Sequence, residues 1–155
     1  MPFETLHAPA AGAPSLIIPA MGLELRVPLS TQASGGAMTI LETINAPASG
    51  PPLHRHHETE VFRIVEGRYL YEVDGRRFEA ATGDFVTIPG GVAHTFTNIT
   101  SLPARQLVLM LPAMDAIAFF RGLGDLMAAG KPDFVALNDY GAPWGVDFLG
   151  PPIKP

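Results

Sequence analysis

The sequence predicts an all-β fold, a small barrel of short strands followed by a short C-terminal helical extension. Short apolar or alternating runs recur along 15–111, and Gly, Pro and Ser residues bound them. Gly and Pro number 16 each, as many strands and turns require. Asp74-Gly75 separates two such runs and is a strong signal for a two-residue hairpin. With 155 residues and 47% apolar residues, the chain can fill one core.

The chain divides into three predicted parts. Residues 1–14 are rich in Ala and Pro and are expected to form an N-terminal arm. The barrel is expected at 15–111, and a helix and tail at 112–155 should pack on it. Within the barrel we predict strands, in order, at 15–18, 23–27, 37–45, 61–65, 69–73, 76–80, 85–88, 95–98 and 105–111.

Particular residues define the ends and faces of these strands. Gly67 and Gly91 stand where a positive φ would turn the chain, so we expect a backbone role for both. The run 107–111 is apolar at every position, which predicts cover on both faces. One face should fill the barrel, and the other should meet the C-terminal helix or a second subunit.

The C-terminal part begins with a helical pattern. From Pro112 onward, apolar residues recur every three or four positions, and Asp115 lies near the predicted N-terminus, where the helix dipole favours an anion. Gly122 and Gly124 weaken the pattern and allow a break into two pieces. Gly130-Lys131-Pro132 should end it.

The aromatic residues of the C-terminal part could have either of two roles, packing in the core or contributing to the site. Phe119 and Phe120 are expected to belong to the core rather than to contact a substrate. In the ending, which is rich in Gly and Pro, Trp144 and Phe148 are expected to tie down the terminus. The alternative is that the ending caps the mouth of the barrel.

Three histidines and a carboxylate carry the predicted chemistry. His54, His56 and Glu60 share one parity, so on an extended strand they face the same interior, and His94 would join them from a second strand. An isolated His-x-His can be a solvated pair, but the joint pattern favours a metal site. Imidazole suits zinc, copper, iron or nickel, and the carboxylate also admits manganese. His57 has the opposite parity and lies outside this set, as does His7 in the arm.

These residues resemble the two conserved motifs of the cupin superfamily. The first motif is met from His54 to Gly67, except that Ala48 stands at its opening glycine, and the second is met in full from Gly83 to Asn98. The resemblance implies a double-stranded β-helix, or jelly-roll barrel. It implies one divalent metal per subunit (Fe, Mn, Ni, Co, Cu or Zn), held by His54, His56, Glu60 and His94. It also implies a homodimer packed through its sheets.

Composition excludes several functions. The formal charge is −5 and no cluster of Lys and Arg exists, which argues against a nucleic-acid partner. There is no Cys, so disulfides and thiolate ligands are excluded. The first 25 residues contain no Lys or Arg, and prolines interrupt their apolar stretch, so neither a signal peptide nor a membrane span is predicted. A cytoplasmic location is the default expectation.

The ending of the chain is similar to that of small single-domain cupins that resemble quercetinases. This resemblance implies a metal-dependent dioxygenase that cleaves a flavonol-like or other enolic or aromatic small molecule with dioxygen. Glu60 would also be the catalytic base, and Phe62, which shares the ligand parity, is expected to be a wall of the substrate pocket. Two alternatives stay open: a non-redox cyclase, isomerase or lyase, such as a polyketide cyclase-like enzyme, and a non-catalytic small-molecule-binding module.

Overall fold

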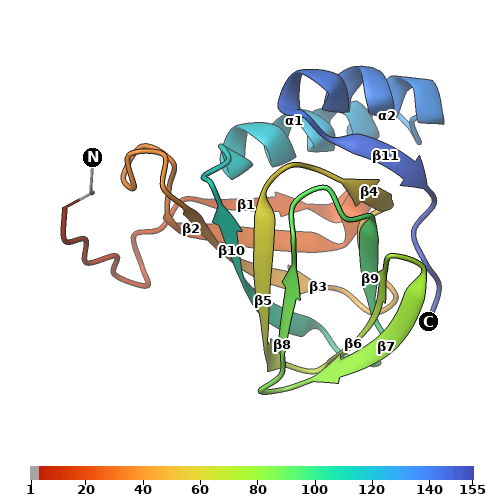
Figure 1. The fold of residues 1–155 in the computed structure, drawn as a ribbon, viewed down its shortest axis with the longest axis horizontal. Helices are drawn as coiled ribbons and strands as arrows, with labels where there is room; N and C mark the ends of the chain where they lie inside the picture. Colours follow the sequence, from red (N-terminus) through yellow and green to blue (C-terminus); the bar gives the residue numbers. More distant parts are fainter. Residues whose placement is uncertain (1–3) are drawn as a thin grey trace.

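Two antiparallel sheets face each other and form a barrel (Figure 1). The computed structural model describes residues 4–155, so residues 1–3 of the predicted arm lie outside the described residues. One sheet contains, in spatial order, β1 (Ser15–Ile18), β2 (Leu23–Leu29), β3 (Thr39–Asn45), β10 (Ala104–Leu111), β5 (Thr59–Glu66) and β8 (Phe85–Ile88). The other contains β11 (Asp147–Gly150), β4 (Leu53–Arg55), β9 (His94–Asn98), β6 (Arg68–Val73) and β7 (Arg76–Ala81). The predicted all-β fold is confirmed.

The nine predicted strands all exist, with ends that differ by a few residues, and two strands were not predicted. These are β4 and β11, which span three and four residues and pair with each other. Both lie in segments rich in Pro or Gly, where alternation is too short to recognise. At the predicted hairpin, Asp74 and Gly75 have φ values of 49° and 75°, as a type I′ turn requires. Gly67 and Gly91 also have positive φ values, 91° and 84°.

Alternation along the central strands separates the barrel interior from the outside. On β10, Gln106, Val108 and Met110 are buried, whereas Leu107 and Leu109 are only partly buried. Within the single chain, the outward face of this apolar run is therefore partly exposed. The inner face is covered as expected, and cover of the outer face by a second subunit stays a prediction.

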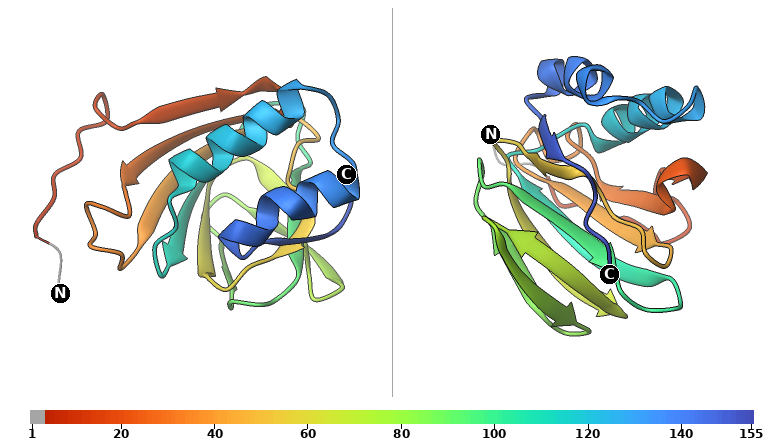
Figure 2. Two further views of the ribbon diagram at one scale, coloured as in Figure 1. Left: turned by 90° about the horizontal axis from the view of Figure 1, so that it is seen from above. Right: turned by 90° about the vertical axis from the view of Figure 1, so that its right-hand side faces the viewer.

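Two helices, α1 (Ala116–Ala128) and α2 (Phe134–Gly141), lie at one end of the barrel (Figures 1 and 2). The structure also contains two short 3-10 helices, η1 (Pro19–Met21) and η2 (Ala142–Trp144). The backbone N–H of Ala118 donates to the Asp115 carboxylate at the start of α1 (3.2 Å), and Ala136 N–H donates to Asp133 at the start of α2 (2.8 Å). Neither helix of the described chain is long and apolar enough to span a membrane.

The break expected inside the first helix does not occur. Gly122 and Gly124 lie within a continuous α1. Each of them lets a neighbouring element approach the helix closely. A Cβ at Gly122 would lie 2.5 Å from the Tyr140 hydroxyl oxygen of α2, and one at Gly124 would lie 3.2 Å from Ile18 of β1. These glycines therefore serve packing. The helix α2 was not predicted at all, and α1 begins four residues after Pro112.

Candidate metal centre

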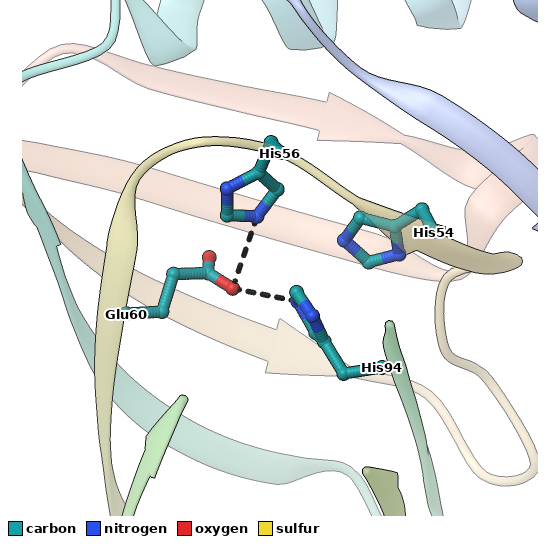
Figure 3. A group of neighbouring side chains, drawn as sticks. All are labelled: His54, His56, Glu60 and His94. Atoms are coloured by element: carbon teal, nitrogen blue, oxygen red, sulfur yellow. Dashed lines mark hydrogen bonds and ion pairs between the residues drawn. The ribbon is translucent and has the colours of Figure 1, made fainter. Parts of the chain in front are cut away.

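Four side chains converge inside the barrel: His54 of β4, His56 of the following turn, Glu60 of β5 and His94 of β9 (Figure 3). Each offers one nitrogen or oxygen ligand atom, and these atoms all lie within 4.8 Å of one another. The chain thus brings together every residue that the sequence pattern selected. His94 arrives from a second strand, directly opposite His54 in the register of β4 and β9.

The assumed path of the chain between these residues was wrong. His54, His56 and Glu60 do not share one strand, because β4 ends at Arg55 and β5 begins at Thr59 in the other sheet. Gly91 N–H donates to the carbonyl of His56 (2.6 Å), so the loop before β9 pairs with this turn. Gly90 packs so closely that a Cβ there would lie 2.0 Å from the His57 carbonyl oxygen. The turn, rather than strand parity, places the two histidines beside Glu60.

Each of the three imidazoles has an oxygen atom close to Nδ1, and for His56 this contact is an ion pair rather than a hydrogen bond of good geometry. His54 Nδ1 lies 2.8 Å from the Pro52 carbonyl oxygen, and His94 Nδ1 lies 2.8 Å from the Val92 carbonyl oxygen. His56 Nδ1 lies 3.1 Å from Oε2 of Glu58. Such contacts fix the orientation of a ring and leave Nε2 as the donor atom for a metal.

Glu60 is the anion of the cluster. Its Oε2 lies 2.9 Å from Nε2 of His94 and 3.3 Å from Nε2 of His56. Burial acts to raise the pKa of the Glu60 carboxyl, but hydrogen bonds from His56 and His94 outweigh burial and hold this pKa well below its ordinary value. The carboxylate is therefore charged at neutral pH.

The histidines differ in their protonation. Burial and the neighbouring His94 lower the pKa of His54 to about 3. Burial also acts to lower the pKa of His56, but hydrogen bonds to Glu58 and Glu60 outweigh it and raise the pKa to about 10. In the metal-free protein, a cation on His56 thus balances the buried carboxylates. Three imidazole nitrogens and one carboxylate oxygen are a donor set that fits a divalent transition metal.

An apolar cavity of about 100 Å³ adjoins the four residues. Phe62, Phe96, Leu41 and Val108 form its walls within the barrel. The other end is closed by residues of α1, β11 and the segments next to them, among them Phe119, Phe120, Leu123, Val146 and Phe148. The predicted pocket residue Phe62 is 2% exposed and lies in the wall of this cavity.

The C-terminal aromatics serve both the core and the cavity. Phe119 is buried and its ring packs against the rings of Phe120 and Trp144, with centroids 5.2 and 5.5 Å away. Phe119 and Phe120 also line the cavity, although the sequence favoured a core role. Trp144 packs on the helix, as expected. Phe148 follows the alternative reading, since it lines the cavity and its ring centroid lies 6.4 Å from that of His54.

Two kinds of residue at the site were missed by the sequence reasoning. Glu58 is buried against His56, and its acidic group at the parity of His56 was a usable signal. Thr43 and Asn45 line the cavity from β3, where nothing in the sequence distinguishes them from filling residues. Outside the cluster, the His57 side chain is 67% exposed and His7 is exposed in the arm, in agreement with their exclusion.

Comparison with known proteins finds a family match for the central part of the chain. Residues 41–110 match the family described as the cupin domain. An uncharacterized protein of Methanocaldococcus jannaschii is 33% identical over 79 residues, which cover 50% of this chain and 63% of that protein. Quercetin 2,3-dioxygenase of Bacillus subtilis is 31% identical over 72 residues, 46% of this chain and 20% of that enzyme. The chain thus spans less than two thirds of the length of both curated relatives.

Solved structures with this fold have diverse activities. An RmlC-like cupin from Shewanella frigidimarina has a TM-score of 0.64 and 18% identity, over 76% of this chain and 99% of that chain. An oxalate decarboxylase variant of Bacillus subtilis has a TM-score of 0.59 and 18% identity, over 68% and 29%. A sugar phosphate isomerase from Silicibacter pomeroyi has a TM-score of 0.51 and 25% identity, over 59% and 61%. The fold therefore does not determine the reaction.

Proposed function

Residues 41–110 are a cupin domain, and on this premise we propose that the protein is a metal-dependent dioxygenase that cleaves an enolic substrate. His54, His56, Glu60 and His94 are the proposed ligands of one divalent metal. The observation that carries the proposal is the cluster itself: its ligand atoms lie within 4.8 Å of one another at the edge of an apolar cavity. Partial similarity to quercetin 2,3-dioxygenase supports the choice of reaction.

The size and lining of the cavity support one kind of substrate. Apart from the histidines and Glu60, no ionisable side chain of the described residues lines it, so no partner for a phosphate or a polyacid is present. Its volume of about 100 Å³ is below the ~300–1,000 Å³ that is usual for drug-sized ligands. We therefore favour an enolic molecule with one ring over a three-ring flavonol.

The metal, when bound, supplies a cation that stabilises the deprotonated enol and brings it together with dioxygen. The residues of the chain do the rest. Glu60 lies at the cavity edge, so its carboxylate, once loosened from the metal, would be placed to accept the enol proton. The walls around Phe62 and Phe96 exclude water and orient the flat substrate. The reaction would break a carbon–carbon bond and incorporate both oxygen atoms of dioxygen.

A second candidate is non-redox chemistry, such as isomerisation, cyclisation or elimination. It is favoured by the shared fold of the sugar phosphate isomerase, in which case zinc or nickel would act as a Lewis acid. A non-catalytic module that only binds a small molecule is the third reading. An ordered ligand set with a charged carboxylate next to the cavity argues for catalysis over mere binding.

The proposal is tested by oxygen uptake. The purified protein is depleted of metal, reloaded separately with iron, manganese, nickel, cobalt, copper or zinc, and mixed with benzoylacetone or with a flavonol. We expect at least one redox-active metal to give stoichiometric oxygen consumption with the diketone, and slower consumption with the flavonol. Substrate conversion that does not depend on dioxygen would replace the proposal with the non-redox alternative. Tight metal binding without any conversion would favour the binding module.

We further propose that the protein is a homodimer that packs through the six-stranded sheet. Partly exposed Leu107 and Leu109 on the outward face of β10 support this assembly. Light scattering of the purified protein should give twice the chain mass, and Leu109→Glu should reduce it to the chain mass. A monomeric wild-type protein would contradict the dimer.

A further inference from the structure

We propose that the barrel interior holds a second substrate contact, a hydrogen-bonding subsite formed by the Thr43 hydroxyl, with Gln106 as its cross-strand neighbour. This subsite would bind an uncharged acceptor oxygen at the end of the substrate remote from the metal. The inference rests on the proposed function, since it concerns the same cavity. It adds a substrate class: a metal-chelating enol, an aromatic ring and a carbonyl or ether oxygen beyond the ring.

The register of the strands gives the order of these contacts along the barrel. Glu60 of β5 pairs with Met110 of β10, and one step further Phe62 pairs with Val108. The next step brings Gln106 opposite Ile64, and on the other side of β10 Gln106 pairs with Thr43 of β3. Four residues of strand separate the two levels, which is roughly 13 Å.

The layer between the two levels is apolar. Phe62, Val108 and Leu41 share it, because Val108 pairs with both of the others. All three line the cavity, and so does Phe96, whose ring centroid lies 5.6 Å from that of Phe62. A flat ring placed between these side chains would have its two ends near polar groups on opposite sides of the apolar layer.

At the level of Thr43 and Gln106, the one remote from Glu60, two polar atoms have no hydrogen-bond partner among residues 4–155. They are Oγ1 of Thr43 and Nε2 of Gln106, in side chains that are 7% and 1% exposed. Buried groups of this kind are usually paired, so an unpaired hydroxyl that lines a cavity is a candidate partner for a ligand there. Thr43 lines the cavity, and Gln106 is its direct cross-strand neighbour.

Two tyrosine hydroxyls form hydrogen bonds with the amide side chains next to Thr43. The hydroxyl of Tyr71 donates to Oε1 of Gln106, and the hydroxyl of Tyr69 donates to Oδ1 of Asn45 (3.0 Å). The amide carbonyl of Gln106 is thus occupied, and Tyr69 also lies next to this amide. The Thr43 hydroxyl, which lines the cavity, can donate to an acceptor oxygen of the substrate. Since no Lys or Arg lines the cavity, we expect this oxygen to be uncharged.

The test compares two ligands of equal size that differ in one acceptor. Binding of para-methoxybenzoylacetone and para-ethylbenzoylacetone to the zinc-loaded protein is measured by calorimetry, because zinc permits binding without oxidation. We expect the methoxy compound to bind about 10-fold more tightly, as one additional hydrogen bond would give. Thr43→Val should abolish this preference, and Thr43→Ser should keep it.

Thr97 provides a matched control. Its hydroxyl is also buried without a partner among the described residues, but Thr97 does not line the cavity. Thr97→Val should leave the preference for the methoxy compound unchanged. Both Thr→Val variants should raise the melting temperature of the ligand-free protein, because each removes a buried unpaired hydroxyl without changing the volume. A fall in melting temperature for Thr43→Val would indicate a structural role instead.

The outcomes separate the subsite from the proposed function. Equal affinity of wild-type protein for the two diketones would overturn the subsite and indicate that water alone satisfies Thr43 and Gln106. A preference that survives in Thr43→Val would overturn it as well. Neither result affects oxygen uptake, which tests the dioxygenase separately. Absence of zinc binding, or of any diketone binding, would overturn both proposals together.

Discussion

Nδ1 of His56 lies 3.1 Å from Oε2 of Glu58, and the two side chains are each 4% exposed. This contact is the one place where a side-chain carboxylate, rather than a backbone carbonyl, lies against the Nδ1 atom of a proposed ligand in the described chain. A carboxylate partner orients the ring and makes Nε2 a stronger donor. Glu58 is therefore a positioning residue for the metal, although its side chain is not among the four ligands.

Replacing Glu58 tests this relationship. Glu58→Gln should weaken metal binding by about 10- to 100-fold, as losses of such outer contacts usually do. The measurement is competition for zinc against a chromophoric chelator. Glu66→Gln is the control, because the Glu66 side chain is 68% exposed and pairs only with Arg105 at the surface. Equal affinities in the two variants would show that Glu58 does not position His56.

Glu60 has two proposed roles, and one substitution separates them. Glu60→Gln keeps an oxygen donor of the same length but cannot accept a proton. We expect the variant to retain a large part of its metal and to lose oxygen uptake by about 100-fold or more, the usual contribution of a general base. Metal content by mass spectrometry and uptake rates are measured on the same samples. A rate equal to that of wild type would leave Glu60 as a ligand at most.

Ala48 occupies the place of the first motif's opening glycine, and it has the φ value of 57° that a glycine would favour. Its N–H donates to the carbonyl of Asn98 (2.9 Å), which holds this conformation. Ala48→Gly should therefore raise the free energy of unfolding by about 0.5–1 kcal/mol. The same substitution at exposed Ala129, where φ is −76°, should lower it by a similar amount. Urea denaturation of the two variants checks the opposite signs.

The metal-free protein should have a characteristic pH dependence of stability. The pKa of His56 is raised from 6.5 to about 10, so its favourable contribution is complete below pH 6.5 and disappears as the pH rises towards 10. The pKa of Glu60 is lowered, so its contribution is present above about pH 4.5 and is lost as the pH falls. The pKa of His54 is lowered to about 3, so its contribution is also lost as the pH falls below 6.5. The free energy of unfolding should therefore be greatest near pH 6.5.

Urea titrations of chelator-treated protein at pH 6, 8 and 9.5 measure the alkaline limb. His56→Asn should flatten it, because the titrating group is gone. Zinc-loaded protein should show the reverse trend from pH 6 to 8, since metal binding requires unprotonated imidazole. A metal-free protein whose stability rises from pH 6 to 9.5 would contradict the assigned charge on His56.

The proposed ligands could be predicted from the sequence because their types and spacing are local. The spacing from His54 to Glu60 and the position of His94 after Pro89 appear in the chain itself. The strand path between them could not be predicted, because the turn at His56 is made by pairing with Gly91, a residue far along the chain. Parity selected residues that do cluster, but for a reason that the structure does not support.

The cavity closure depends on contacts that local patterns do not encode. Phe148 lies on a strand of four residues that exists because it pairs with β4, and α2 packs against it. The unpaired state of Thr43 and Gln106 also becomes visible only when strands β3 and β10 are placed side by side. Local sequence patterns therefore indicated the proposed ligands, whereas the substrate side of the site required the fold.

Metal content is the most direct test of the whole account. Wild-type protein and the variants His56→Ala and His94→Ala are purified in parallel, and bound metals are quantified by mass spectrometry after dialysis against each candidate ion. The account predicts about one equivalent of a divalent transition metal per wild-type chain, and a small fraction of that in both variants. Full stoichiometric metal in both variants, or none in wild type, would contradict it.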